Sequence, residues 1–148
     1  MPRRSTRSLA VIESIMRASE QEFERFVTSH IGPLAQRHGA SIIREDGPIL
    51  QSAEFSAGPV CVRFNNDRGL LSLDVSPTHV LRFWAVEEIA RLLPPIRLLS
   101  GGVQRLSLTE QFELVQAHWP ELESMFGVAN YRQTAQLLSQ TAPTNRPR

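Results

Sequence analysis

The stretch from Val60 to Val75 constrains the fold of this chain more than any other feature. Apolar and polar residues alternate on both sides of the sequence Asn66-Asp67-Arg68-Gly69. Strict alternation is typical of a strand with one buried face, and Asn, Asp and Gly are residues that favour tight turns. The stretch therefore predicts a β-hairpin that presents one face to the core of an antiparallel sheet.

A four-residue loop over 66–69 would make Asn65 and Leu70 neighbours. This register pairs apolar residues only: Phe64 with Leu71, Val62 with Leu73, and Val60 with Val75. A slip by one residue would pair core residues with polar ones. We therefore expect this register, which makes Arg63 and Asp74 diagonal neighbours on the outer face, as a surface ion pair of small energetic value.

The remaining strands are expected on the N-terminal side of the hairpin. Gly-Pro pairs at 47–48 and 58–59 mark turns, so the sequence predicts four strands in all: Ala40–Glu45, Leu50–Phe55, Val60–Asn65 and Leu70–Val75. Short connections favour a sequential antiparallel meander.

Helices are expected on both sides of these strands. The sequence Ser19-Glu20-Gln21-Glu22 matches a capping box and predicts the start of a second N-terminal helix. The alternative is a single kinked helix from Leu9 to Leu34. Gly39 is the expected C-terminal cap. Further helices are predicted from the apolar spacing after residue 83, and near Ala129 to Gln140. Their inward stripes are Phe83, Val86, Ile89, Ala90 and Leu93, then Phe112, Val115, Trp119, Leu122 and Phe126.

These elements predict an α+β fold. It consists of a central antiparallel four-stranded β-meander, with N-terminal helices and C-terminal helices packed on one face. A chain of 148 residues fits one domain, expected over residues 8–140 between flexible basic tails at 1–7 and 141–148.

The charge is unevenly distributed along the chain. All sixteen basic residues are arginine, and five of them lie in the two tails. Residues 8–142 hold eleven arginines against fifteen acids, a net charge of −4. An acidic body argues against a nucleic-acid-binding surface on the domain itself. RNA binding could then involve only the arginine tails, and it ranks behind the two hypotheses given below.

The sequence predicts a cytoplasmic protein without a membrane partner. No apolar run approaches the ~18 residues of a membrane span, and Glu13 interrupts the apolar segment after the basic N-terminus. The single cysteine, Cys61, excludes an internal disulfide. No spacing of the four histidines suggests a metal site, and no cofactor is expected.

Two groups of residues are candidates for a functional site. Glu110, Glu113 and Glu121 form an acidic row on the predicted C-terminal helices, and with Trp84 they could bind a protein partner through charge and an aromatic anchor. The alternative is a ligand or enzyme site on the outer sheet face, made of Cys61, Arg63 and Asp74 with His79 nearby. We expect no catalytic residue in the leading interpretation.

The segments 62–69 and 73–75, followed by Phe83-Trp84 at the start of a helix, resemble small bacterial immunity proteins of polymorphic toxin systems. The likeness covers roughly residues 40 to 126. It implies a cytoplasmic protein that binds a cognate toxin and has no catalysis of its own. Such families bind through differing surfaces, so no site residue is carried over. The acidic body fits a basic toxin domain, which makes a non-enzymatic, immunity-type binding module the leading hypothesis.

Overall fold

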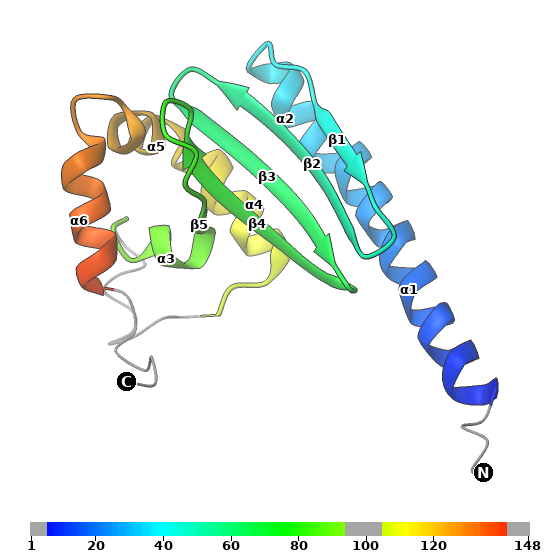
Figure 1. Ribbon diagram of the computed structural model, residues 1–148. Coiled ribbons are helices and arrows are strands. Elements are labelled where there is room, and N and C mark those ends of the chain that lie inside the picture. The colour runs from blue at the N-terminus through cyan, green and yellow to red at the C-terminus, as the bar shows by residue number, and fades with distance from the viewer. Residues whose placement is uncertain (1–5, 94–104, 142–148) are drawn as a thin grey trace.

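The computed structural model describes residues 6–93 and 105–141. Its centre is a five-stranded antiparallel sheet in which the strands follow one another in chain order (Figure 1). The strands are β1 (Ile43–Asp46), β2 (Leu50–Ala57), β3 (Val60–Asp67), β4 (Leu70–Pro77) and β5 (Trp84–Ala85). The α+β class and the antiparallel meander are thus as predicted, with five strands where four were expected.

The β3–β4 hairpin is shifted by two residues from the expected register. Phe64 pairs with Leu73, and Val62 pairs with Val75. The reason is the turn, which has only Arg68 and Gly69 at its centre, with φ angles of 54° and 91°. Positive φ at both central residues is typical of a two-residue type I′ turn. Because the shift is even, the inward face stays the same, and Phe64, Leu73, Val62 and Val75 are all buried.

The N-terminal helices are continuous. Helix α1 (Thr6–Phe26) runs into a π-helical segment, η1 (Val27–Ile31), and then into α2 (Gly32–Arg37). The expected capping box at Ser19 was wrong, because Ser19 lies inside α1 and its hydroxyl donates to the Met16 carbonyl at 2.8 Å. The π segment carries the helix through Gly32, whose N–H donates to the Val27 carbonyl.

Gly39 ends this long helix as expected. Its φ is +67°, and the Ala40 N–H next to it donates back to the Ala35 carbonyl at 2.8 Å. This bond satisfies a carbonyl that the end of a helix would otherwise leave unpaired.

The segment after β4 begins as a strand, not as the helix expected from Phe83 onward. Trp84 pairs with Val75, and Ala85 pairs with Asp74. Helix α3 (Val86–Ala90) begins only after this short strand. A two-residue strand is too short to show alternation, so the helical spacing that follows it dominated the prediction.

The C-terminal helices are α4 (Leu108–Ala117), α5 (Trp119–Phe126) and α6 (Tyr131–Thr141). Ser107 caps α4 in a full capping box with Glu110. Pro120 lies in the first turn of α5, so it starts a new helix and does not kink an old one. The expected inward residues of α4 and α5 are all buried, as are Tyr131 and Leu138 of α6.

One hydrophobic core joins the N-terminal and C-terminal helices to the inward face of the sheet. Phe23 of α1 stacks on Phe64. Phe26 packs on Phe64 with its ring tilted and meets Phe112 of α4 edge to face. In Figure 1, α1, α2, α4 and α5 all lie behind the sheet. The expectation that the helices pack on one face therefore holds for these four helices.

The described part of the chain begins and ends within helices. Helix α1 begins at Thr6 and α6 ends at Thr141, and the rest of both predicted tails lies outside the described residues. Within the described ranges, no helix combines the length and the hydropathy that crossing a bilayer requires.

Candidate functional site

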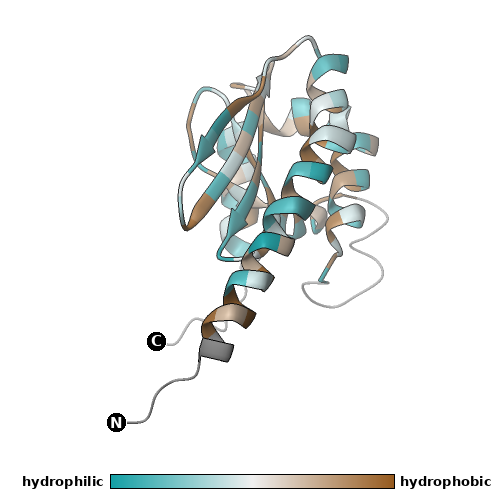
Figure 2. Cartoon of the chain, turned by 90° about the vertical axis from the view of Figure 1, so that its right-hand side faces the viewer, coloured by the Kyte–Doolittle hydropathy of each residue, from teal (hydrophilic) through white to brown (hydrophobic). Residues whose placement is uncertain are grey.

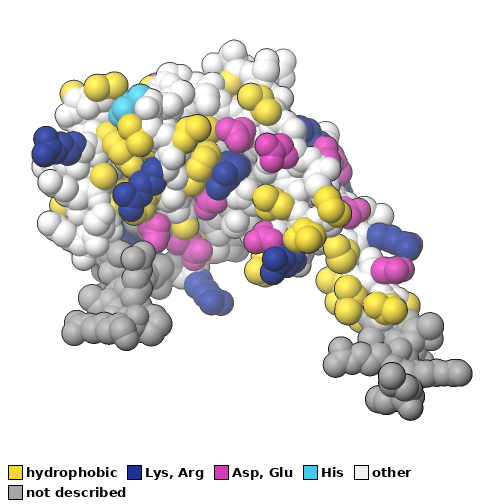
Figure 3. All heavy atoms as spheres, viewed as in Figure 1, with side chains coloured by type: hydrophobic (Ala, Val, Ile, Leu, Met, Phe, Trp, Pro, Cys, Tyr) yellow, Lys and Arg dark blue, Asp and Glu magenta, His cyan; other side chains and the backbone are white. Residues whose placement is uncertain are grey.

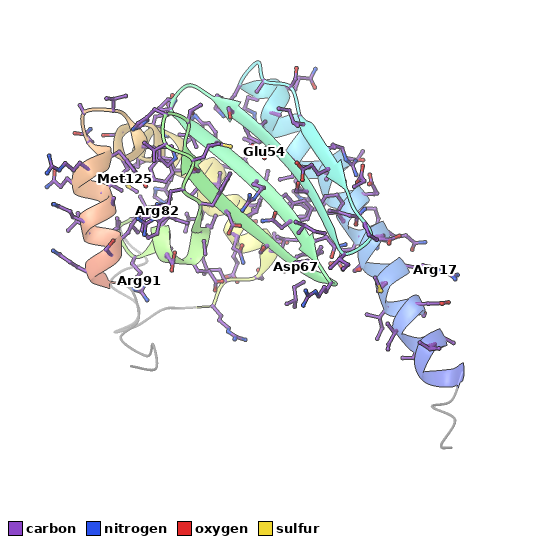
Figure 4. The ribbon with its side chains drawn as sticks, in the orientation of Figure 1. Arg17, Glu54, Asp67, Arg82, Arg91 and Met125 are labelled. Atoms are coloured by element: carbon purple, nitrogen blue, oxygen red, sulfur yellow. The ribbon has the colours of Figure 1, made fainter. Side chains whose placement is uncertain are left out.

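The outer face of the sheet carries polar residues brought together from three strands. Glu54 of β2 lies opposite Arg63 of β3, and Arg63 lies opposite Asp74 of β4. Figure 4 shows Glu54 on the sheet, with Arg82 nearer to α6. The structure therefore unites Cys61, Arg63 and Asp74 on one face, as the sequence predicted.

Arg63 is held from two sides. Its Nη2 lies 3.7 Å from Asp74 Oδ2, and its guanidinium carbon lies 3.7 Å from the centroid of the Phe83 ring. Arg63 and Asp74 pair directly across the hairpin, not diagonally, because of the two-residue shift in register. Asp74 also accepts a 2.8 Å hydrogen bond from Asn65 Nδ2. The cation of Arg63 is thus already partnered by a carboxylate and by an aromatic face.

The two groups on this face that could do chemistry have shifted titrations. Burial raises the pKa of the Asp74 carboxyl above its usual value, although the Arg63 cation and the Asn65 hydrogen bond oppose it. Burial also raises the pKa of the Cys61 thiol, and the Glu54 carboxylate acts in the same direction. Cys61 is fully buried, and its Sγ lies 3.4 Å from Glu54 Oε2. A protonated, buried thiol is a poor nucleophile, so the position of Cys61 is better explained by packing than by catalysis.

His79 does not join this cluster through any contact in the structure. It lies in the loop after β4 and packs edge to face on Tyr131 of α6, with ring centroids 5.6 Å apart. Together with Val128, Arg132 and Gln136 it lines an open groove of about 830 Å³ along α6. The predicted four-residue site therefore divides into a sheet-face cluster and a separate groove.

The acidic residues of α4 and α5 all lie on exposed parts of their helices. Glu110 has a local role, because its Oε1 accepts the Ser107 N–H at 2.9 Å, and this bond lowers the pKa of its carboxyl. Glu121 lies 3.7 Å from His118 Nδ1. Glu113 and Glu123 have no ion-pair partner among the described residues. The acidic row therefore presents carboxylates to solvent, and the Glu110 carboxylate also takes part in capping the start of α4.

Trp84 was expected to supply an aromatic anchor for a protein partner, but it is buried. Only 6% of it is exposed, because its indole N–H donates to the Tyr131 hydroxyl at 3.1 Å. The Arg82 guanidinium carbon also covers its ring at 4.3 Å from the centroid. These contacts join β5 to α6 and leave Trp84 inside the protein.

One residue that positions the acidic surface escaped sequence reasoning. Gln111 of α4 is buried, and its Oε1 accepts the backbone N–H of Leu73 in β4 at 3.2 Å. Its Nε2 donates to the Leu106 carbonyl at 3.0 Å. The sequence did contain a sign of this role. Gln111 is a polar residue next to Phe112, on the inward side of the predicted helix, where an unpaired amide would be costly.

Metal binding and RNA binding were also considered in the sequence analysis. Across residues 6–93 and 105–141, no group of three or more His, Cys, Asp or Glu side chains is placed to hold a metal ion. The RNA hypothesis rests on Arg3, Arg4, Arg7, Arg146 and Arg148, whose side chains lie outside the described part of the chain.

Comparison with known proteins gave no relative from which a role could be carried over. No protein-family model, no curated protein and no solved structure matches this chain.

Proposed function

We propose that this chain is a non-enzymatic protein-binding module of the immunity type, which neutralises a basic toxin domain through the carboxylates of α4 and α5. The observation that carries the proposal is the charge of this surface. Residues 108–126 contain Glu110, Glu113, Glu121 and Glu123 and no arginine, and all four glutamates are exposed.

The arrangement suits an extended basic surface. The four carboxylates are spread over two consecutive helices. This arrangement suits contact with an extended surface better than contact with a small ligand. Complementary charge speeds and orients the association of two proteins. Both helices are fixed to the sheet by buried residues such as Phe112, Trp119 and Leu122, so the backbone that carries the carboxylates needs little ordering when a partner binds.

The sheet-face cluster supports the same proposal indirectly. Arg63 is partnered by Asp74 and Phe83, and the pKa of the Cys61 thiol is raised by burial. A catalytic arginine or thiolate would need to be freed from these contacts before it could act. Binding through the opposite, helical side of the molecule requires no such change.

The test is capture of a partner from a lysate of the producing cell at about 150 mM salt, where weak attraction between surfaces is largely screened. Glu113→Gln, Glu121→Gln and Glu123→Gln are combined in one variant. Glu110 is left intact because it caps α4. We expect the wild type to retain one basic protein in a stoichiometric amount, and the triple variant to retain much less of it.

The matched control combines Glu20→Gln, Glu22→Gln and Glu45→Gln. These glutamates are also exposed, so the control changes the net charge by the same amount at another place. Equal loss of partner in both variants would mean that the total charge matters and the α4–α5 surface does not. Retention of the partner by the α4–α5 variant would overturn the proposal.

A further inference from the structure

The open groove along α6 is separate from the acidic row, because no glutamate of α4 or α5 lines it. Its volume is about 830 Å³. Two adjacent rows of α6 residues at four-residue spacing line it: Tyr131, Ala135 and Ser139, and beside them Arg132, Gln136 and Gln140. His79, from the loop between β4 and β5, and Val128 complete the lining. We call this surface the α6 groove.

Basic side chains surround a buried aromatic pair beside the α6 groove. The Trp84 indole N–H donates to the Tyr131 hydroxyl at 3.1 Å. The Arg82 guanidinium carbon lies 4.3 Å from the centroid of the Trp84 ring, and the His79 ring meets the Tyr131 ring edge to face at 5.6 Å. Arg132 follows Tyr131 in α6 and is exposed. A guanidinium stacked on a ring is held in place while its N–H groups can still bind an oxyanion. We call Arg82, Arg132 and His79 the basic rim.

The basic rim has no acidic partner within residues 6–93 and 105–141. The stretches 75–86 and 124–141, which supply the rim, contain no Asp or Glu. Glu87 of α3 is already occupied, because its Oε2 accepts the Leu106 N–H at 2.7 Å. Figure 3 shows basic and histidine side chains among apolar ones over α6 and between α6 and the sheet, whereas the acidic side chains lie over α3, the sheet and α1. The acidic body thus contains a local zone of positive charge.

The rest of the α6 groove suits a peptide backbone. From Tyr131 to Gln140 the helix rises roughly 14 Å, which is the length of about four residues of extended chain. Gln136 and Gln140 are exposed, and each amide can both donate and accept, as the groups of an extended backbone require. A single anion such as phosphate would contact only the basic rim and leave this length unused.

The charge of the basic rim favours an acidic occupant from another protein, because complementary charge orients association. The residues outside the described ranges contain five arginines and no Asp or Glu, so they carry the wrong charge to fill the groove. A nucleic acid needs a basic surface that continues beyond one groove, and residues 8–142 have a net charge of −4. A short segment with carboxylates meets both the charge and the length of the groove.

We propose that the α6 groove binds an extended acidic segment of a second protein, with its carboxylates at the basic rim and its backbone along Gln136 and Gln140. This site is opposite in charge to the α4–α5 surface and leaves that surface open. One chain would therefore hold a basic partner and an acidic partner at the same time.

The test is the binding of fluorescent peptides, each about ten residues long, to the full chain, measured by anisotropy at about 150 mM salt. One pool has Asp or Glu at every second position with varied residues between, and the matched pool has Asn or Gln at those positions. We expect the acidic pool to bind, and the neutral pool to bind at least about tenfold more weakly. Arg82→Gln with Arg132→Gln should cause a similar loss, because both charge-assisted contacts are removed.

The matched control is Arg25→Gln with Arg37→Gln, which changes the net charge by the same amount at exposed positions of α1 and α2. Helix α1 faces the viewer in Figure 2, on the side of the molecule away from α6. We expect this control to bind the acidic pool as the wild type does. An equal loss in both double variants would mean that total charge, and not the α6 groove, attracts the peptides.

A second pair of variants locates the peptide along α6 without changing the size of a side chain. Gln136→Glu places a carboxylate in the α6 groove and should weaken binding of the acidic pool at least about tenfold. Gln133→Glu is the control, because Gln133 is exposed on the same helix but does not line the groove, and it should bind nearly as the wild type does. Equal binding by the two variants would overturn the proposal.

Three further results would also overturn it. The first is a wild type that binds neither pool. The second is tighter binding, dependent on Arg132, of a single-stranded oligonucleotide or of anionic lipid vesicles. The third is self-association above the chain mass of 16.7 kDa that is abolished by Glu113→Gln, Glu121→Gln and Glu123→Gln together, because the groove would then take the acidic row of a second copy.

Discussion

Replacing Gln111 by methionine should loosen the attachment of α4 to the sheet. Methionine has nearly the length and shape of glutamine but cannot form its two hydrogen bonds. The side chain of Gln111 is the partner of the Leu73 N–H in β4, at a position where β5 does not continue the ladder, because β5 pairs only with Asp74 and Val75. The substitution therefore removes the one partner that the structure gives this amide.

The magnitude follows from what each lost bond leaves behind. Leu73 is 1% exposed, so water cannot replace the bond to its N–H, and an unpaired buried donor costs about 1–3 kcal/mol. Leu106 is only partly buried, so water can reach its carbonyl and the second bond costs little. The apolar methionine recovers a part of the loss. We expect the free energy of unfolding to fall by about 2 kcal/mol, out of the ~5–15 kcal/mol that such domains have.

The assay is urea unfolding followed by tryptophan fluorescence, together with hydrogen exchange at the Leu73 amide. Exchange at this amide should become faster in the variant even under native conditions. Gln133→Met is the matched control, because Gln133 lies on an exposed part of α6 and its change should stay within about 0.5 kcal/mol. A Gln111 variant as stable as the control, with the Leu73 amide still protected, would refute the reasoning.

Two further predictions concern the outer sheet face. Cys61 should react with a thiol reagent far more slowly in the folded protein than in urea, because burial raises its pKa and blocks access; labelling at equal rates in both states would contradict the buried position. The raised pKa of Asp74 means that the folded state binds its proton more readily than the unfolded state does. The contribution of Asp74 to stability is therefore greatest below the ordinary aspartate pKa of about 4 and is lost as the pH rises through the folded pKa. Relative to Asp74→Asn, the wild type should lose stability in denaturant titrations as the pH rises above about 4; a difference that grows with pH would show that the carboxylate is net stabilised in the fold.

The faces of the elements could be predicted from the sequence, and their exact alignment could not. Alternation from Val60 to Val75 identified the buried side of the hairpin, which an even shift in register does not change. The register itself depended on whether Asn66 and Asp67 belong to the turn or to the strands. Only the positive φ of both Arg68 and Gly69 decides this, and arginine gives little sign of it in a sequence.

Local motifs were ambiguous for a related reason. The pattern Ser-x-x-Glu occurs at Ser19 and again at Ser107, and only Ser107 starts a helix. Ser19 has no free N–H groups to cap, because the residues before it continue the helix. The choice between the two depends on the preceding residues and not on the motif.

The candidate surfaces were predictable to differing degrees. The acidic residues of α4 and α5 could be placed on exposed sides because their helices have clear apolar stripes. Trp84 could not, because its burial depends on Tyr131, which is 47 residues away in the chain. Leu9 and Ile12 recur at helical spacing, but whether such an apolar face is covered depends on how far the sheet extends, and no local pattern encodes that.

The central claim is that this chain acts by stoichiometric binding and not by turnover. The most direct measurement is a titration of the captured partner's activity with increasing amounts of this protein. We predict a linear loss of activity that ends at one chain per partner, does not progress with time, and is reversed when the complex is dissociated by high salt. Loss of the partner's activity at amounts of this chain far below one equivalent, increasing with time and persisting after separation, would contradict the account and show that the chain is an enzyme.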